Sequence, residues 1–375
     1  MYSTDTVKNI LKMTQVFWII ALVALVGPSV ALDCVQIPKD QIIPRHFVTI
    51  PAGSNDTVEI PPNYSCTYLV TVPPMVYAHV RLENGLEGNN DMITVIDQQA
   101  TRTLVASRSS KILNFYVFPN TTTTFQVVTK SVNMHSKFRL VIFYQNSTFF
   151  HKCHINSSIS VLNPNVTYLG NSDLKYFILN DLQVNSYKNP QIMIGTEQIS
   201  MAIAHSGWDA DIFDNYFVID GDFENPKYVY RMSRFQYSNY ISTGNKLTVV
   251  GLDNRVSESS VVFTPLSQAQ QFDSLTAFGT YFEANQLDIN GKDGNKKRSA
   301  VNVIGMKDYT RILSVEKSSD PNCVLKAVEA PPSSSSEVYL DFSTVTSFPR
   351  NITHQSFSII AENCSASFKL ISLEY

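Results

Sequence analysis

The chain has 375 residues and a formal net charge of −3, and only 16% of its residues are charged. A charge this small indicates no particular partner, and the sequence has no basic stripe, so we expect no nucleic-acid binding. At about 100 to 200 residues per domain, the length predicts two or three domains.

The N-terminal segment has the order of a secretory signal peptide. Lys8 and Lys12 precede an uncharged apolar run at 16–27, and small residues follow it. The run is well short of the roughly twenty residues that a membrane-spanning helix needs. We therefore expect cleavage after Ala31, which removes residues 1–31 and leaves a protein that is secreted to the extracellular space without a stable membrane anchor.

Eight Asn-X-Ser/Thr sequons indicate N-glycosylation along that pathway. The poorest of them is Asn363, because its middle residue is Cys364 and a disulfide there would limit access. We expect glycans at the other seven, which are Asn55, Asn63, Asn120, Asn146, Asn156, Asn165 and Asn351. The stretch between Asn165 and Asn351 has no sequon, so the middle of the chain should stay open to contact.

Five cysteines remain after this cleavage, and an oxidising compartment favours their pairing. Proximity in the sequence predicts the disulfides Cys34–Cys66 and Cys323–Cys364, each worth about 3.5 to 4 kcal/mol because it restricts the unfolded chain. Cys153 is then left over, either as a buried free thiol or as the link of a disulfide dimer.

Hydrophobic residues recur with a period of two along most of the chain. Apolar and polar residues alternate at 76–83, and the alternation recurs at 138–144 and 338–342. These segments are short and are separated by Gly, Pro, Asn and Ser, whereas helical stripes are nearly absent. The sequence therefore predicts an all-β protein built from antiparallel sandwiches.

Parts of the chain are similar to each other. Residues 118–140 are similar to 348–370, since both begin with Phe-Pro and continue with two apolar stretches, and a weaker copy lies at 246–263. Residues 90–97 are likewise similar to 214–221. Repeated sandwiches explain these similarities better than one large fold does.

The predicted domains follow from these repeats. After the signal peptide, we expect a first sandwich at 32–150 and a second at 151–265. Residues 266–375 form either a third sandwich or the completion of the second, and the expected pairing of Cys323 with Cys364 favours a separate unit.

Several features of the first predicted sandwich are shared with a known family. They are Cys34 and Cys66, the run Tyr-Ser-Cys-Thr-Tyr-Leu-Val-Thr-Val-Pro at 64–73, the Asn-Asp-X-Ile-X-Val-X-Asp strand at 90–97 and the apolar ending at 138–144. Through these features residues 34–146 resemble the nematode CUB-like domain family. The resemblance implies tandem CUB-like β-sandwiches of the jelly-roll type, secretion, a role in innate defence against pathogens, and no catalytic activity.

The resemblance also raises the question of calcium. Many CUB domains hold Ca²⁺ through one Glu and two Asp residues, whose hard oxygen atoms suit that ion. Asp91 matches one of these positions by motif, whereas the other two ligands have no evident counterpart. The alternative is that Asp91 and Asp97 bracket a strand and accept hydrogen bonds from the N–H groups of turns.

The densest acidic cluster consists of Asp209, Asp211 and Asp214, next to Trp208. It has three interpretations: a solvated loop, a Ca²⁺ site, or an acid and a base that act on a sugar stacked on Trp208.

The motifs of common enzyme classes are missing from the sequence, which has no Gly-X-Ser-X-Gly elbow, no His-Glu-X-X-His and no phosphate loop. We predict a secreted, glycosylated, non-enzymatic protein of innate immunity that binds an extracellular protein or a microbial or host glycan. It needs no cofactor unless the acidic positions hold Ca²⁺. One alternative is a structural matrix or barrier protein, which a Cys153-linked dimer would favour, and the other is a glycan-active hydrolase that uses the Asp209 to Asp214 cluster.

Overall fold

The structure is a computed structural model. It describes residues 32–374 apart from residues 33, 75, 133, 147–163, 185–187, 206, 208–209, 222–225 and 293–296. The expected signal peptide lies outside the described residues. The chain divides into two compact units, Met1–Gln145 and Asn146–Tyr375. Within the described residues, no helix is long and apolar enough to cross a membrane.

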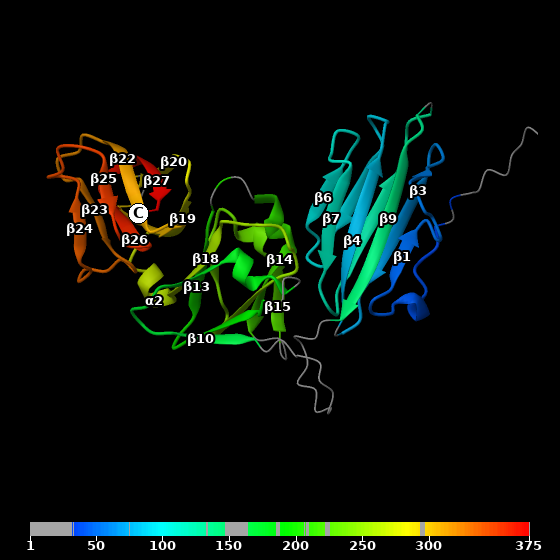
Figure 1. The fold of residues 1–375 in the computed structure, drawn as a ribbon, viewed down its shortest axis with the longest axis horizontal. Coiled ribbons are helices and arrows are strands. Elements are labelled where there is room, and N and C mark those ends of the chain that lie inside the picture. The colour runs from blue at the N-terminus through cyan, green and yellow to red at the C-terminus, as the bar shows by residue number, and fades with distance from the viewer. Residues whose placement is uncertain are drawn as a thin grey trace, which may run out of the picture. The chain divides into compact units, whose positions relative to one another are not determined.

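The first unit is a sandwich of two antiparallel sheets, which we call the first sandwich (Figure 1). One sheet has the order β1-β9-β4-β7, with β2 also pairing with β9; the strands are β1 Phe47–Ile50, β9 Lys137–Asn146, β4 Val76–Gly85, β7 Ile112–Val117 and β2 Val58–Glu59. The other has the order β3-β8-β5-β6, with β3 Ser65–Thr71, β8 Thr122–Val128, β5 Met92–Ile96 and β6 Arg102–Val105. Alternate residues of β3 and β9 are buried, as the period-two pattern predicts.

The described residues of the second unit form four sheets. The second sandwich pairs β10-β12-β17-β14-β15 with β11-β18-β13-β16; its strands are β10 Asn165–Leu169, β11 Lys175–Ile178, β12 Gln191–Gly195, β13 Ile199–Ala204, β14 Tyr216–Gly221, β15 Pro226–Arg231, β16 Tyr240–Ile241, β17 Lys246–Gly251 and β18 Ser260–Pro265. The third sandwich pairs β19-β21-β26-β23-β24 with β20-β27-β22-β25; its strands are β19 Ser274–Thr280, β20 Asn285–Asn290, β21 Arg298–Gly305, β22 Tyr309–Lys317, β23 Val324–Glu329, β24 Val338–Asp341, β25 Arg350–Ile352, β26 Ser356–Glu362 and β27 Ser365–Leu373.

Helical structure in the described residues is limited to short turns, which are η1 Lys39–Gln41, η3 Leu179–Leu182, η5 Ala210–Asn215, η6 Met232–Phe235 and α2 Leu266–Ala269. Each sandwich has its own cluster of buried apolar side chains. The predicted fold, all-β with tandem antiparallel sandwiches, is therefore confirmed.

The three sandwiches repeat one arrangement of nine strands. The second and third have the same strand order in both sheets, so that each strand corresponds to the one nine places later. The first keeps this order for β2 to β9 and differs only at β1. The segments that are similar in sequence occupy equivalent strands, because β8 and β9 correspond to β26 and β27, and β5 corresponds to β14.

At one edge, the strand pairing of the first sandwich differs from that of the second and third sandwiches. In those two, the first strand runs parallel to the third, since β10 pairs with β12 and β19 pairs with β21. In the first sandwich, β1 pairs antiparallel with β9 instead, and residues 34–37 lie along β3. The side-chain amide of Gln36 donates to Thr67 O at 2.8 Å, and its Oε1 accepts from Leu69 N at 2.9 Å. One side chain thus replaces one peptide group of a parallel neighbour.

Both predicted disulfides are confirmed. Cys34 bonds to Cys66 and Cys323 to Cys364, across sequence separations of 32 and 41 residues. The first attaches the 34–37 segment to β3, and the second joins the residue before β23 to the turn between β26 and β27.

Loss of the first disulfide should destabilise the first unit alone. We expect the Cys34→Ser/Cys66→Ser variant to lower its free energy of unfolding by about 3.5 kcal/mol, because the unfolded chain regains the entropy that the loop had removed. Calorimetry of the full chain should show one transition moving to lower temperature. The matched Cys323→Ser/Cys364→Ser variant should move the other transition, and a shift of both transitions by either variant would contradict two independent units.

Candidate functional site

Asp91 lies between β4 and β5, where it joins two loops of the first sandwich. It is buried, and its Oδ1 accepts hydrogen bonds from Lys130 N at 2.8 Å and Ser131 N at 3.0 Å. Its Oδ2 accepts from Ser136 Oγ at 2.6 Å. Gly88 makes room for this carboxylate, since a Cβ there would lie 2.3 Å from Oδ2. Both oxygens of Asp91 are therefore engaged by donors of the protein itself.

The protonation of Asp91 follows from these contacts. Burial raises the pKa of the carboxyl group, but the hydrogen bonds from Ser136, Lys130 and Ser131 outweigh it and hold the pKa below the ordinary value of 3.8. Asp97, the other acidic residue that brackets β5, accepts from Gln99 N and Thr101 N, both at 2.9 Å. Both carboxylates hold loops in place.

The described members of the second acidic cluster have different partners. Asp211 Oδ2 lies 2.6 Å from Arg255 Nη1, whereas Asp214 accepts a hydrogen bond from the Ser233 hydroxyl. Arg255 also contacts Asp253, whose side chain is only 3% exposed, through its Nη2 at 2.8 Å. Burial raises the pKa of Asp253, but hydrogen bonds from Arg255 and Asn215 outweigh it and lower the pKa overall. These acids form ion pairs and hydrogen bonds rather than one converging site.

Several predicted residues lie outside the described part of the chain. They are Trp208, Asp209, Cys153 and Asn156. Within the part that the structure describes, no group of three or more His, Cys, Asp or Glu side chains could hold a metal ion. The Ca²⁺ interpretations of Asp91 and of the second acidic cluster thus find no complete ligand set among those residues.

The described sequons all lie at the surface. The asparagines that we expect to carry glycans and that the structure describes are exposed, and they are Asn55, Asn63, Asn120, Asn146, Asn165 and Asn351. Asn363 is exposed as well, although the Cys364 beside it is buried in a disulfide. Access therefore gives no reason to drop any of them.

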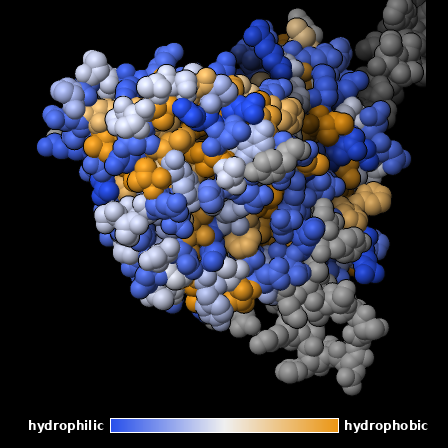
Figure 2. Space-filling view, turned by 60° about the vertical axis from the view of Figure 1, so that its left-hand side comes forward, coloured by the Kyte–Doolittle hydropathy of each residue, from blue (hydrophilic) through white to orange (hydrophobic). Residues whose placement is uncertain are grey.

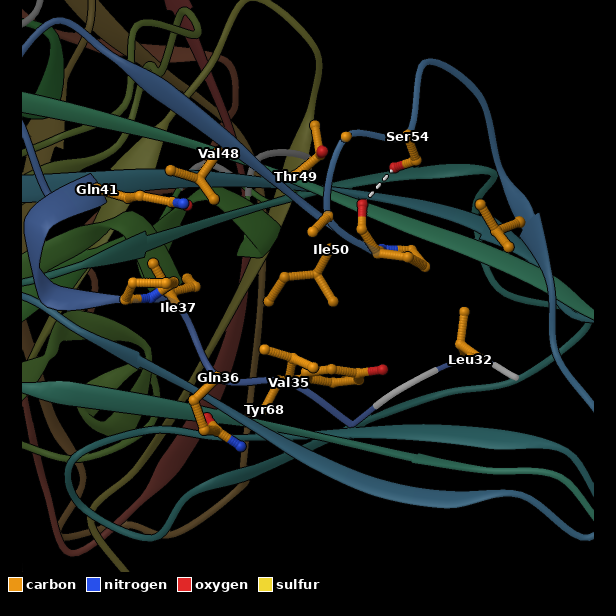
Figure 3. Close-up of a pocket in the computed structure, with 15 residues that line it drawn as sticks. Leu32, Val35, Gln36, Ile37, Gln41, Val48, Thr49, Ile50, Ser54 and Tyr68 are labelled. Atoms are coloured by element: carbon orange, nitrogen blue, oxygen red, sulfur yellow. Dashed lines mark hydrogen bonds between the residues drawn. The ribbon is translucent and has the colours of Figure 1, made fainter. Parts of the chain in front are cut away.

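An apolar pocket opens at the edge of the first sandwich, and we call it the inner pocket. It has a volume of about 520 Å³ and lies between the segment at 32–38, strand β1 and the loop that follows β1. Figure 3 shows Ile37, Ile50 and Tyr68 facing the same space. The Tyr68 hydroxyl bonds to that of Tyr64 at 2.6 Å, and burial raises the pKa of Tyr68, which keeps the ring neutral.

A second pocket of about 390 Å³, which we call the outer pocket, lies beside the first. It is lined by Asp40, Ile43, His46 and Phe47, and it shares Gln41, Val48, Thr49, Ala52 and Gly53 with the inner pocket. The inner and outer pockets together form the β1 groove. Three large apolar side chains are exposed along it, since Val35 is 56%, Ile43 47% and Phe47 65% exposed. Exposed apolar side chains gathered at a concave surface are typical of binding sites.

A different surface lies at the edge of the second sandwich formed by β15 and β16, and we call it the aromatic edge. The rings of Tyr228 and Tyr230 lie 5.8 Å apart, and Tyr230 lies 5.2 Å from Tyr240. Lys227 Nζ lies 5.9 Å from the Tyr228 ring centroid, and Arg234 Cζ lies 5.3 Å from that of Tyr230. On the face of the molecule shown in Figure 2, hydrophobic and hydrophilic side chains of the described residues are mixed.

The comparison with protein families bears on the first sandwich. Residues 29–148 match the family model described as a CUB-like domain. The chain therefore carries a CUB-like domain. The match spans all strands of the first sandwich, including β1, and it also includes Asp91. No curated protein sequence matches the chain.

Solved structures match weakly. The CUB1-EGF-CUB2 domain of human MASP-1/3 covers 58% of this chain and 98% of its own, at 10% identity and a TM-score of 0.23. The corresponding domains of rat MASP-1 cover 61% and 99%, at 10% identity and a TM-score of 0.22. An archaeal virus protein described by a triple jelly-roll fold and turret assembly covers 85% of both chains, at 10% identity and a TM-score of 0.19. Scores this low support no statement about function.

The β1 groove and the Asp253–Arg255 pair were not found from the sequence. The groove of the CUB-like domain is built from three separate segments, near residues 35, 48 and 68, so no local pattern indicates it. Asp253 belongs to no acidic cluster in the sequence. The fold brings Asn215 to Asp253 and Asp211 to Arg255, and these contacts set the role of the pair. The exposure of Phe47, which marks the groove, follows from the structure and not from the sequence around it.

Replacing Asp91 should destabilise the CUB-like domain in a pH-dependent way. We expect Asp91→Asn to lower its free energy of unfolding by about 2 kcal/mol at pH 7, because three donors lose a charged acceptor. Since the folded pKa is depressed, the carboxylate contributes stability above pH 4, and this contribution is lost as the pH falls through the folded pKa. The difference between variant and wild type should therefore shrink below pH 4 in thermal melts.

The exposed Asp40→Asn change is the matched control and should leave the melt unaltered. A wild-type melting temperature that rises with Ca²⁺, and no longer does so in Asp91→Asn, would instead assign Asp91 to a metal.

Proposed function

We propose that this chain is a secreted, glycosylated binding protein of the extracellular space, and that the β1 groove of its CUB-like domain holds the ligand. The observation that carries the proposal is the groove itself, in which exposed Val35 lines the inner pocket of about 520 Å³ and exposed Ile43 and Phe47 line the outer pocket of about 390 Å³. Covering apolar surface of this kind with a partner is favourable, because it removes that surface from water.

The compartment is supported by covalent chemistry and by surface chemistry. Two disulfides are stable in an oxidising environment, which the extracellular space provides. Seven sequons of the described residues are exposed, so the folded surface is compatible with attached glycans. The innate-immune role that the family resemblance implies is part of this proposal.

The proposed protein binds rather than catalyses. Asp211 pairs with Arg255 and Asp214 accepts a hydrogen bond from Ser233, so each of these two carboxylates has its own partner in the protein. This supports the binding function over the hydrolase alternative.

A second candidate function is glycan binding at the aromatic edge. Sugar rings stack on exposed aromatic side chains, and Lys227 and Arg234 add positive charge beside the rings of Tyr228 and Tyr230. The nearest described sequon in the same sandwich, Asn165, begins β10 at the opposite edge of the sheet that ends in β15. A glycan on Asn165 would therefore be attached at the edge opposite to β15, and the positive charge of Lys227 and Arg234 suits an acidic glycan.

Removing apolar side chains from the groove should weaken binding to microbial surfaces. We expect the purified, glycosylated protein to co-sediment with killed bacteria or yeast in a saturable way. The Ile43→Ala/Phe47→Ala variant should bind at least tenfold more weakly, because both side chains are exposed and lose contact area on truncation. Leu104→Ala is the matched control, since Leu104 is 62% exposed on β6 of the same domain. Equal loss in the control, or no binding by the wild type, would overturn the role of the groove.

The aromatic edge has its own test. Tyr228→Ala should weaken binding to insoluble acidic cell-wall glycans about fivefold, as expected for the loss of one stacking contact. Tyr168→Ala serves as the control, because Tyr168 is 71% exposed on β10 at the opposite edge. If both variants retain wild-type affinity, or both lose it equally, the aromatic edge is not the glycan site.

A further inference from the structure

Strand β1 has an open edge. It pairs with β9 on one side, and no other strand of the described residues pairs with its second side. The register aligns Val48 with Ile142 and Ile50 with Leu140, and Tyr144 N donates to His46 O at 3.0 Å. Hydrogen-bonded pairs alternate in an antiparallel ladder, so Val48 and Ile50 direct their N–H and C=O groups toward β9. Those of Phe47 and Thr49 point away from it.

The two pockets of the groove adjoin each other along β1, and Val48 and Thr49 line both of them. Ile50 faces the core and lines the inner pocket, whereas Phe47 is exposed and lines the outer pocket. Successive side chains of an extended strand point to opposite faces. A strand laid along β1 would therefore run past both pockets, with alternate side chains on the face of Ile50, which lines the inner pocket alone, and on the face of Phe47, which lines the outer pocket alone.

We propose that the β1 groove accepts an extended polypeptide segment of a partner protein, which adds to β1 as a new edge strand. This inference rests on the proposed binding function and names the partner class of the same site. The outward N–H and C=O groups of Phe47 and Thr49 supply main-chain hydrogen bonds, and the pockets read alternate side chains.

The lining of each pocket sets the side chain that it takes. Ile37, Ile50 and Tyr68 make the inner pocket apolar, so it suits a branched aliphatic side chain. The outer pocket combines Ile43 and Phe47 with Asp40 and His46, so it suits a longer side chain with a hydrogen-bond donor. The strand β1 has four residues, about 13 Å of chain, which limits the added strand to a similar length.

The repeats show that this side of the sandwich accepts strands. In the second and third sandwiches, β10 and β19 add to the edges of β12 and β21, which are equivalent to β3. Tyr68 of β3 and Ile50 of β1 line the same inner pocket, so the open edge of β1 belongs to the side that the other sandwiches extend with a strand of their own. A peptide is favoured over a small apolar ligand because the outward main-chain groups of Phe47 and Thr49 pair with no strand of the described residues.

The probe is a displayed library of linear twelve-residue peptides, selected on the full glycosylated protein. We expect selected peptides to alternate aliphatic and polar residues. For one such synthetic peptide, methylation of alternate backbone nitrogens should abolish binding in one register and preserve it in the other. Only a strand whose alternate amides bond to β1 gives this difference. The inference would be overturned if both methylated peptides still bind, or if both fail to bind.

A second measurement reports on the protein. Peptide binding should slow amide hydrogen exchange of Phe47 and Thr49 at least tenfold and leave Val48, already bonded to β9, unchanged. Thr49→Pro removes an outward N–H without touching the β9 ladder and should weaken peptide binding at least tenfold. Because that variant also changes a buried side chain, its own thermal melt must match that of the wild type, and the exchange measurement on the wild type tests the same contact without any substitution.

The other occupants have distinct outcomes. If β1 pairs with β1 of a second copy, the wild type will sediment as a dimer and Thr49→Pro as a monomer, and the inference is wrong. If selected peptides bind without protecting Phe47 and Thr49, the groove holds side chains alone, which also overturns strand addition. If the library yields no binding peptide although the protein binds microbial surfaces, the peptide partner is contradicted. The proposed binding function then remains in place.

Discussion

The edge strand of each sheet is the constraint on which this structure depends. A sandwich buries its faces well, but the outermost strand of each sheet keeps a row of N–H and C=O groups that no neighbour satisfies. The second and third sandwiches cover one such edge with a parallel strand, β10 or β19. The CUB-like domain covers the equivalent edge of β3 with Gln36 and a disulfide, and uses its first strand to extend the opposite sheet. The groove and its exposed apolar side chains result from that exchange.

Much of the fold could be predicted from local sequence. Alternation at 138–144 marks β9, because a strand buried on one face must repeat every two residues. The pairing of Cys34 with Cys66 followed from proximity alone. The similarity of 90–97 to 214–221 located β5 and β14 as equivalent strands. These signals are short-range, or compare one stretch with another, and need no knowledge of the packing.

The candidate site could not be predicted in the same way. Nothing within Asn165–Leu169 or Phe47–Ile50 states which strand each will pair with, since partner choice depends on residues far away in the chain. The acidic residues were recognised as a group because they are close in sequence. In the fold, Asp211 contacts Arg255 and Asp214 contacts Ser233. The neighbours that set the chemistry of these two acids therefore come from segments 19 to 44 residues away.

One wall of the β1 groove is covalently fixed before any ligand arrives. Val35 and Ile37 lie between Cys34, which is bonded to β3, and a 3-10 turn at Lys39–Gln41, and the Gln36 amide holds the segment at two points. A ligand therefore has little conformational entropy to remove from this wall, and more of the contact energy remains as affinity. If the surroundings reduced this disulfide, the segment would be released from β3, and the groove would lose a fixed wall although neither cysteine lines the pocket.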